Sequence, residues 1–247
     1  MVRYDTTRPR RQNPAAVVRA ARVGGLGCDP QMIPRSRQEE RMSLEPVLIA
    51  GVWRQARNPL GAFSVPQRRR RLILMAGRGF RIHLPQATGE SLSVRMAIGD
   101  LPVAGQSGDP AHDHGESRSP KVRKLIRCIP RDGGSRMALG EANQLECHRR
   151  VDGFKDVFGR MAWDDPAPTI TSGSVNPSKG RFLHPTEDRS ITLREAALLQ
   201  TFPATYKLAM NRGKHPNARF VGEAIPPALA RIQGMKIKEA LRRRLVV

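Results

Sequence analysis

Small and apolar residues between positions 188 and 206 are spaced as in one short helix. Thr192 and Glu195 have the spacing of a capping box, in which each side chain accepts a hydrogen bond from the other residue's amide. Pro203 ends the helix because it forces Phe202 out of the helical region. An ordinary capped surface helix would give the same local pattern. The helix formers are Leu193, Ala196, Ala197, Leu199 and Gln200.

Two other stretches have the pattern of strands. The continuous apolar run at 72–76 ends at a glycine, as expected for a strand buried on both faces. The prolines in 166–171 fix an extended backbone, so Thr169 and Thr171 point to one face and Ile170 to the other. A half-buried strand with routine threonines explains the second stretch equally well, and both readings are compatible.

The C-terminal segment predicts a final helix. Pro226 and Pro227 suit its N-terminus. Three arginines at 242–244 are favourable at the negative end of the helix dipole. Left without a sheet to pack against, the apolar stripe of this helix and the run at 72–76 are expected to stay exposed. The stripe consists of Leu229, Ile232, Ala240, Leu241 and Leu245.

The remaining stretches are less regular. Residues 105–120 are rich in Gly, Ser, Asp, His and Pro, which predicts a loop. Residues 121–127 and 129–134 alternate basic and turn residues. Either a plain linker or loops that enter the major groove of DNA would account for them. Residues 1–60 are dominated by Arg, Pro, Gly and Ala and do not have the pattern of a domain.

The charge balance is extreme. The chain of 247 residues has 43 Lys and Arg against 22 Asp and Glu, a formal net charge of +21. This charge points to a polyanionic partner, most simply nucleic acid, although a solvated basic tail in the N-terminal third would supply much of it. Arg189 and Arg194 lie at the N-terminal end of the predicted helix, where the dipole disfavours positive charge. They are therefore expected to meet an external anion or a buried acidic partner.

The cysteines indicate neither a disulfide framework nor a metal site. Cys28, Cys128 and Cys147 are far apart and lack a C-x-x-C spacing, so we expect neither disulfides nor a zinc site. Cys147 and His148 lack the paired spacing of metal ligands, and no metal is predicted. No apolar run is long enough to span a bilayer and no signal peptide is visible, so the expected location is cytoplasmic, without a membrane partner.

Four segments in order resemble the DNA (cytosine-5) methyltransferase family. Residues 64–77 resemble the eighth conserved block, usually G-V-P-Q-R-R-x-R followed by a strand. Residues 159–171 resemble the end of the family's target-recognition region, and 188–203 resemble the ninth block. Residues 220–230 resemble the tenth, usually G-N-A-V-P-P. The resemblance covers residues 61–247.

The resemblance implies an α/β fold. It would consist of a fragment of the Rossmann-like fold of S-adenosylmethionine-dependent methyltransferases plus a mixed, mostly β target-recognition domain. Residues 61–83 would end the catalytic domain, and 84–212 would form the recognition domain with the ninth block, opened by a short helix at 93–102. Residues 213–247 would hold the tenth block and a helix returning to the catalytic domain. Residues 1–60 stay unassigned.

The resemblance also implies DNA-contacting residues. Gln67, Arg69 and Arg71 match Q-x-R-x-R, whose arginines face the DNA and the flipped cytosine, so Arg69 and Arg71 are the implied catalytic contacts to the base. Arginine suits this role because its planar fork donates two hydrogen bonds to phosphate or a ring carbonyl. Thr169 and Thr171 would present hydroxyls to the DNA backbone.

A further DNA contact is expected at Arg194 in the ninth block. For the cofactor, S-adenosyl-L-methionine, the resemblance points to Gly222, Glu223 and Ala224. Glu223 stands where Asn is commonest, and its carboxylate would repel the carboxylate of the cofactor.

The implied activity is transfer of a methyl group from S-adenosylmethionine to C5 of cytosine in double-stranded DNA, as in restriction-modification systems. The family's nucleophile lies in Pro-Cys-Gln, which this sequence lacks, together with a Gly-rich cofactor loop and Glu-Asn-Val. We therefore expect an incomplete C-terminal part that is inactive alone: a truncation, a frameshift product, or one piece of an enzyme whose second chain carries the N-terminal catalytic blocks. The alternatives are a non-catalytic DNA-binding protein derived from the recognition domain and a nonfunctional remnant.

Overall fold

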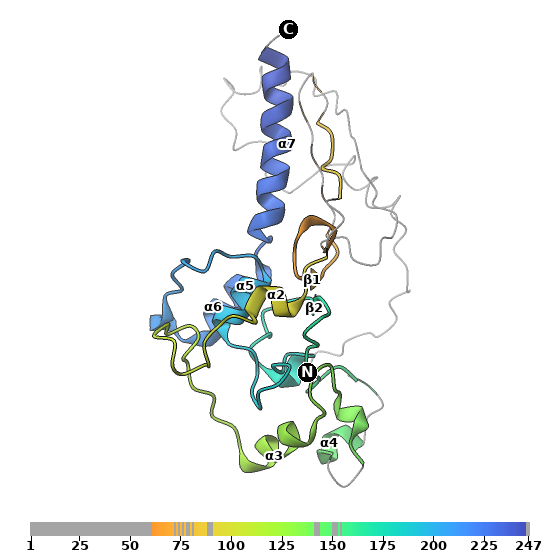
Figure 1. Ribbon diagram of the computed structural model, residues 1–247, viewed down its shortest axis with the longest axis vertical. Coiled ribbons are helices and arrows are strands. Elements are labelled where there is room, and N and C mark those ends of the chain that lie inside the picture. The colour runs from red at the N-terminus through yellow and green to blue at the C-terminus, as the bar shows by residue number, and fades with distance from the viewer. Residues whose placement is uncertain are drawn as a thin grey trace, which may run out of the picture. The chain divides into compact units, whose positions relative to one another are not determined.

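The computed structural model describes residues 61–245, apart from 72, 74, 76, 78–79, 81, 88–90, 141–143, 150–152 and 154. The predicted strand at 72–76 lies mostly outside these residues, and the segment 1–60 lies entirely outside them. Figure 1 shows the elements along the chain. The strands and α-helices are β1 (Gln67–Arg68), α2 (Val94–Ile98), α3 (Pro120–Cys128), α4 (Glu146–Arg149), β2 (Ala167–Pro168), α5 (Leu193–Leu199), α6 (Lys214–Glu223) and α7 (Pro227–Leu245). Single 3-10 turns are η3 (Gly61–Phe63), η4 (Arg136–Ala138), η6 (Pro177–Lys179) and η7 (Met210–Arg212).

The two strands form a parallel pair. Gln67 lies opposite Ala167, and Arg68 lies opposite Pro168. The predicted strand at 166–171 is thus confirmed at its first residues. Beyond them the expected alternation also holds, because Ile170 is fully buried whereas Thr171 is exposed.

Helix α5 is the predicted helix, and its capping box is present. Thr192 Oγ1 accepts from the Glu195 amide at 3.2 Å, and Glu195 Oε2 accepts from the Thr192 amide at 2.7 Å. The helix contacts both α2 and α6, and all of its residues except Leu198 are buried, so it is a core helix rather than a surface one. The largest core cluster includes Val94, Ile98, Ile170, Leu193, Ala196, Ala197, Leu199, Ala218 and Val221.

Residues 121–127, expected to alternate basic and turn residues, instead lie within helix α3. Ser119 caps it by accepting from the Val122 amide, and Pro120 occupies its first turn. Leu125 and Ile126 follow Val122 at spacings of three and four, so one face is apolar and packs into a second core cluster. The other members of this cluster include Ile129, Leu139, Phe158 and Leu183.

Helix α7 begins at Pro227, as predicted. The expectation that its apolar stripe would stay exposed is wrong at its N-terminal end, because Leu229 is only 1% exposed and packs against Phe63 and Val65. Farther along, Leu241 is 45% exposed and agrees with the expectation. The first turn of α7 is therefore anchored on the segment that precedes β1.

Candidate functional site

Two glutamine side chains join the three segments that resemble the eighth, ninth and tenth blocks. Gln67 Nε2 donates to the Leu199 carbonyl at 3.2 Å and to Gln200 Oε1 at 2.5 Å. Gln67 Oε1 accepts from the Ile170 amide at 3.2 Å. Gln200 Nε2 in turn donates to the Val221 carbonyl at 2.7 Å. An amide side chain both donates and accepts, so these two residues link β1, the chain just after β2, α5 and α6 in one buried chain of hydrogen bonds.

The arginines after Gln67 divide into a buried residue and exposed ones. Arg69 is 2% exposed, and its Nη1 donates to the carbonyls of Ile170 at 2.9 Å and Gly222 at 3.0 Å. Arg70 and Arg71 are exposed, and neither has an acidic partner within the described part of the chain. Of the two arginines predicted to contact a base, only Arg71 therefore presents its guanidinium to solvent.

The two threonines predicted to contact DNA also differ in how exposed their hydroxyls are. Thr169 Oγ1 donates to the Arg68 carbonyl at 2.8 Å, which ties β2 to β1. Thr171 is exposed, and its hydroxyl accepts from the Gly173 amide at 3.3 Å. A hydroxyl oxygen that accepts one bond still has a proton to donate, so Thr171 is the more available of the two.

The segment predicted to line the cofactor pocket lies at the end of α6, a helix that the sequence pattern did not predict. Gly222 packs so closely that an added Cβ would lie 2.2 Å from the Thr171 carbonyl carbon. Glu223 is exposed and accepts from Arg219 Nε at 2.8 Å. Gly222 therefore serves helix packing against the chain after β2, and the Glu223 carboxylate points to a surface ion pair.

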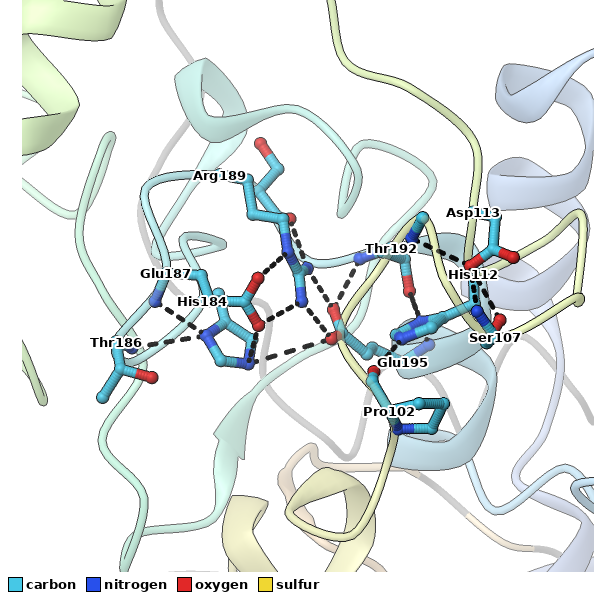
Figure 2. A network of polar contacts seen from close by, with 12 residues as sticks. Pro102, Ser107, His112, Asp113, His184, Thr186, Glu187, Arg189, Thr192 and Glu195 are labelled. Carbon is cyan, nitrogen blue, oxygen red and sulfur yellow. Dashed lines mark hydrogen bonds and ion pairs between the residues drawn. The ribbon is translucent and has the colours of Figure 1, made fainter.

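A partly buried network of charges surrounds the N-terminus of α5 (Figure 2). Arg189 Nη1 and Nη2 donate to the two carboxylate oxygens of Glu195 at 2.8 and 2.7 Å. The same guanidinium donates through Nε and Nη2 to Glu187, both at 2.9 Å. His184 Nδ1 accepts from the amides of Thr186 and Glu187, so in the neutral ring the proton is on Nε2. The buried acidic partner expected for Arg189 is thus Glu195.

Burial and pairing shift the pKa values of this network in definite directions. Burial lowers the pKa of His184 below its ordinary value. Burial alone would raise the pKa of Glu195, but hydrogen bonds from Arg189 and its charge outweigh that effect and lower it. Near neutral pH the network therefore holds an ionised Glu195 beside a neutral His184.

Arg194, predicted to contact DNA, has an acidic partner inside the protein. It is 7% exposed, and its Nε donates to Asp109 Oδ2. The loop that contains Asp109 is held on α5 by a further link: His112 Nε2 donates to the Pro102 carbonyl, and His112 Nδ1 meets Thr192 Oγ1, both at 2.8 Å. The guanidinium of Arg194 is thus engaged in docking this loop.

Asp113 closes the same loop. Its carboxylate accepts from the Ser107 hydroxyl and from the amides of Gly105, Ser107 and Gly108. Desolvation would raise its pKa, but these hydrogen bonds lower the pKa of Asp113 to about 2. The loop predicted at 105–120 is therefore an ordered turn, which ends where Ser119 caps α3.

Arg160 is a key residue that sequence reasoning missed. Its side chain is fully buried, and it donates to five oxygen atoms. Two are the carbonyls of Ile126 and Ile129 at the C-terminal end of α3, and the others belong to His184, Glu187 and Asp188. The only signal in the sequence is an arginine close to two apolar residues, Phe158 and Met161.

Comparison with known proteins agrees with this arrangement of motifs. The C-5 cytosine-specific DNA methylase family matches residues 61–239. The Type II methylase M.HgiDII of Herpetosiphon aurantiacus is 37% identical over 190 residues, which cover 72% of this chain and 53% of that protein. The Type II methyltransferase M1.BsuMI of Bacillus subtilis (strain 168) is 30% identical, covering 68% and 39%. DNA (cytosine-5)-methyltransferase 3 of Arabidopsis thaliana is 31% identical, covering 73% and 17%.

The chain therefore belongs to the C-5 cytosine-specific DNA methylase family. It spans about half the length of M.HgiDII and less of the other two relatives. Membership implies the fold of the S-adenosylmethionine-dependent methyltransferases, of which the described residues contain a small parallel sheet and its helices. Of the helices that the structure describes, none has the length and apolar character needed to cross a membrane.

Proposed function

We propose that this chain is the C-terminal part of a DNA (cytosine-5-)-methyltransferase of the restriction-modification kind. The observation that carries the proposal is the junction at Gln67 and Arg69, where three motif segments far apart in sequence meet beside the exposed Arg71. In this proposal Arg71 and Thr171 contact double-stranded DNA. Gln67 and Arg69 hold the segments that present them.

In this proposal each segment of the chain belongs to a particular domain. Residues 61–83 end the catalytic domain, 84–212 form the target-recognition domain, and 213–247 return to the catalytic domain. Residues 1–60 are left unassigned. Docking of the 105–113 loop on α5 through Asp109 and His112 supports a recognition region built on the ninth block.

S-adenosyl-L-methionine is the cofactor that the family implies. The described residues alone do not fit it, because Gly222 is packed against Thr171 and Glu223 is paired with Arg219. A complete site needs residues from outside the described part. We propose that they come with the segment that supplies the nucleophile.

The reaction of the family requires a cysteine thiolate to attack C6 of a cytosine that has been flipped out of the helix. None of the three cysteines of this chain lies in the Pro-Cys-Gln context that the resemblance requires. Cys128 and Cys147 are exposed and free. We therefore propose that the chain binds duplex DNA but does not methylate it unaided.

The test combines binding with methyl transfer. The purified chain should bind duplex DNA with strong salt dependence, and with about six phosphates neutralised its affinity should drop on the order of a thousandfold between low and physiological salt. It should transfer no labelled methyl group to DNA above a no-protein control. Co-expression with a family N-terminal half should restore transfer, measured as protection of plasmid DNA from methylation-sensitive cleavage. Methylation by the chain alone, or a flat salt titration, would contradict the proposal.

A further inference from the structure

The surface of α3 carries a compact group of positive charges. Arg123 and Arg127 are one turn apart, and Lys124 lies beside them. All three are exposed, whereas Leu125 and Ile126 on the opposite side are buried. We call Arg123, Lys124 and Arg127 the α3 basic face. It is flanked by the exposed Lys121 and Arg131.

These charges differ from several other arginines of the described residues. Arg68, Arg95, Arg118, Arg181 and Arg219 each form a salt bridge with a carboxylate. Within the described ranges, the α3 basic face has no acidic partner. Like charges three and four residues apart on a helix repel one another. An external polyanion would relieve that repulsion, and nothing in the described structure does so.

Arg160 fixes the position of this face. Its guanidinium donates to the carbonyls of Ile126 and Ile129 at 3.0 and 3.2 Å, which satisfies acceptors that the end of a helix leaves free. The same group binds the His184 carbonyl at 3.1 Å and the Asp188 carboxylate at 2.6 Å. The basic face is therefore joined rigidly to the segment that leads into α5, rather than carried on a free loop.

We infer that the α3 basic face binds the sugar-phosphate backbone of duplex DNA and reads no base. Arg123 and Arg127 are four residues apart, about 6 Å along the helix axis, and duplex DNA carries one phosphate charge per about 1.7 Å, so this length corresponds to roughly three to four phosphate charges. Three cations on one face suit this spacing. Contacts of this kind set the orientation of a protein on DNA without sequence preference. The inference rests on the proposed function and adds to it the element that positions the duplex.

The test is the salt dependence of DNA binding by the full chain. The triple variant Arg123→Gln, Lys124→Gln, Arg127→Gln keeps good helix formers while it removes three charges. Each phosphate contact contributes about −0.9 to the slope of log K against log salt, so the slope should become less negative by about 2 to 3. Affinity should fall by the same factor for duplexes of different sequence. Single variants Lys124→Gln and Arg127→Gln should each change the slope by about 1, which keeps the test valid if the triple variant is unstable.

A second triple variant is the matched control. Arg219→Gln, Lys236→Gln, Arg243→Gln removes the same charge from residues that already have carboxylate partners. It should change the slope less than the α3 variant does. Equal slopes for both triple variants, or an α3 variant that binds DNA as the parent does but loses binding to anionic vesicles, would overturn the inference. If the parent chain itself binds no duplex, the proposed function has failed instead.

Discussion

Gln67 donates a hydrogen bond to Gln200 across 133 positions of sequence, with 2.5 Å between Nε2 and Oε1. Both side chains are fully buried. Each also bonds a third segment: Gln67 accepts from the Ile170 amide, and Gln200 donates to the Val221 carbonyl. Because a buried polar group without a partner is costly, the two glutamines depend on each other.

The first prediction concerns this pair. Gln67→Ala leaves Gln200 Oε1 and the Ile170 amide without their partner, so the free energy of unfolding should fall by about 2 kcal/mol or more. Urea denaturation of the full chain measures the change. Gln106→Ala removes an exposed side chain and should stay within about 0.5 kcal/mol of the parent. Equal midpoints for the two variants would refute the linking role of Gln67.

Gly222 should not tolerate a methyl group. In Gly222→Ala the new Cβ would lie 2.2 Å from the Thr171 carbonyl carbon and 2.3 Å from the Ser172 amide, both backbone atoms. We expect a loss of about 3 kcal/mol, at the upper end for overpacking, read from the thermal midpoint. Gly234→Ala in α7 meets nothing within 4 Å and should instead stabilise the protein by up to about 1 kcal/mol. A harmless Gly222→Ala would mean that α6 does not pack on the chain after β2.

Thr192→Ala should weaken the N-terminus of α5. It removes the oxygen that accepts from the Glu195 amide, which costs about 1 kcal/mol. It also removes the partner of His112 Nδ1, so the total should exceed that of a simple cap. Thr205→Ala, at an exposed turn position, is the control and should leave the denaturant midpoint unchanged. An unchanged midpoint in Thr192→Ala would argue against the capping box.

Stability should fall as the solution becomes acidic. The pKa of His184 is lowered by burial, so below about 6.5 the unfolded chain binds this proton and the folded protein does not. The pKa of Glu195 is also lowered, so protonation of this carboxylate further reduces the free energy of unfolding as the pH falls below about 4.3. Thermal midpoints measured from pH 7 to pH 3 should therefore decrease in both ranges. His184→Asn keeps an acceptor near Nδ1 and should remove only the decrease between pH 7 and pH 5; a decrease there that survives the substitution would exclude His184 as its source.

Substitution of Arg71 should lower methylation without affecting stability, whereas substitution of Arg69 should lower stability. Arg71→Ala should leave the free energy of unfolding within about 0.5 kcal/mol, because the side chain is exposed, while it abolishes most methylation in a complex restored with an N-terminal half. Arg69→Ala should destabilise the chain, because it leaves the carbonyls of Ile170 and Gly222 unpaired. The two measurements are chemical unfolding and plasmid protection. Full activity in Arg71→Ala would remove this residue from the DNA contacts.

Sequence reasoning succeeded where the signal was local. Thr192 and Glu195 predicted both the start and the cap of α5, because a capping box needs only residues three apart. Pro227 predicted the start of α7 for a similar reason. Helix α3 does not stand out in the sequence because four basic residues are interspersed among its apolar ones, and only packing against Phe158 and Leu183 shows that its apolar face forms a core.

The site was only partly predictable for a physical reason. The family pattern selected Gln67 and Arg69, but their bonding depends on carbonyls more than a hundred residues away. The place of Arg194 in the helix dipole predicted either an external anion or a buried acidic partner, and the structure shows the latter, Asp109, 85 residues earlier. Arg160 had no motif at all, since its acceptors are mostly carbonyl oxygens, which every residue carries.

The distance between Arg69 and its acceptor at Gly222 has a consequence for synthesis. The two residues are 153 positions apart, and a ribosome adding about 5 to 20 residues per second needs roughly 8 to 30 seconds to pass from one to the other. At the start of that interval β1 has no β2, α5 or α6 to pair with, and the guanidinium of Arg69 lacks its carbonyl partners at Ile170 and Gly222. The nascent chain therefore carries an unpaired strand edge next to Phe63 and Val65, a surface that a chaperone would bind and that invites aggregation. Only when Gly222 emerges does the junction have all its parts.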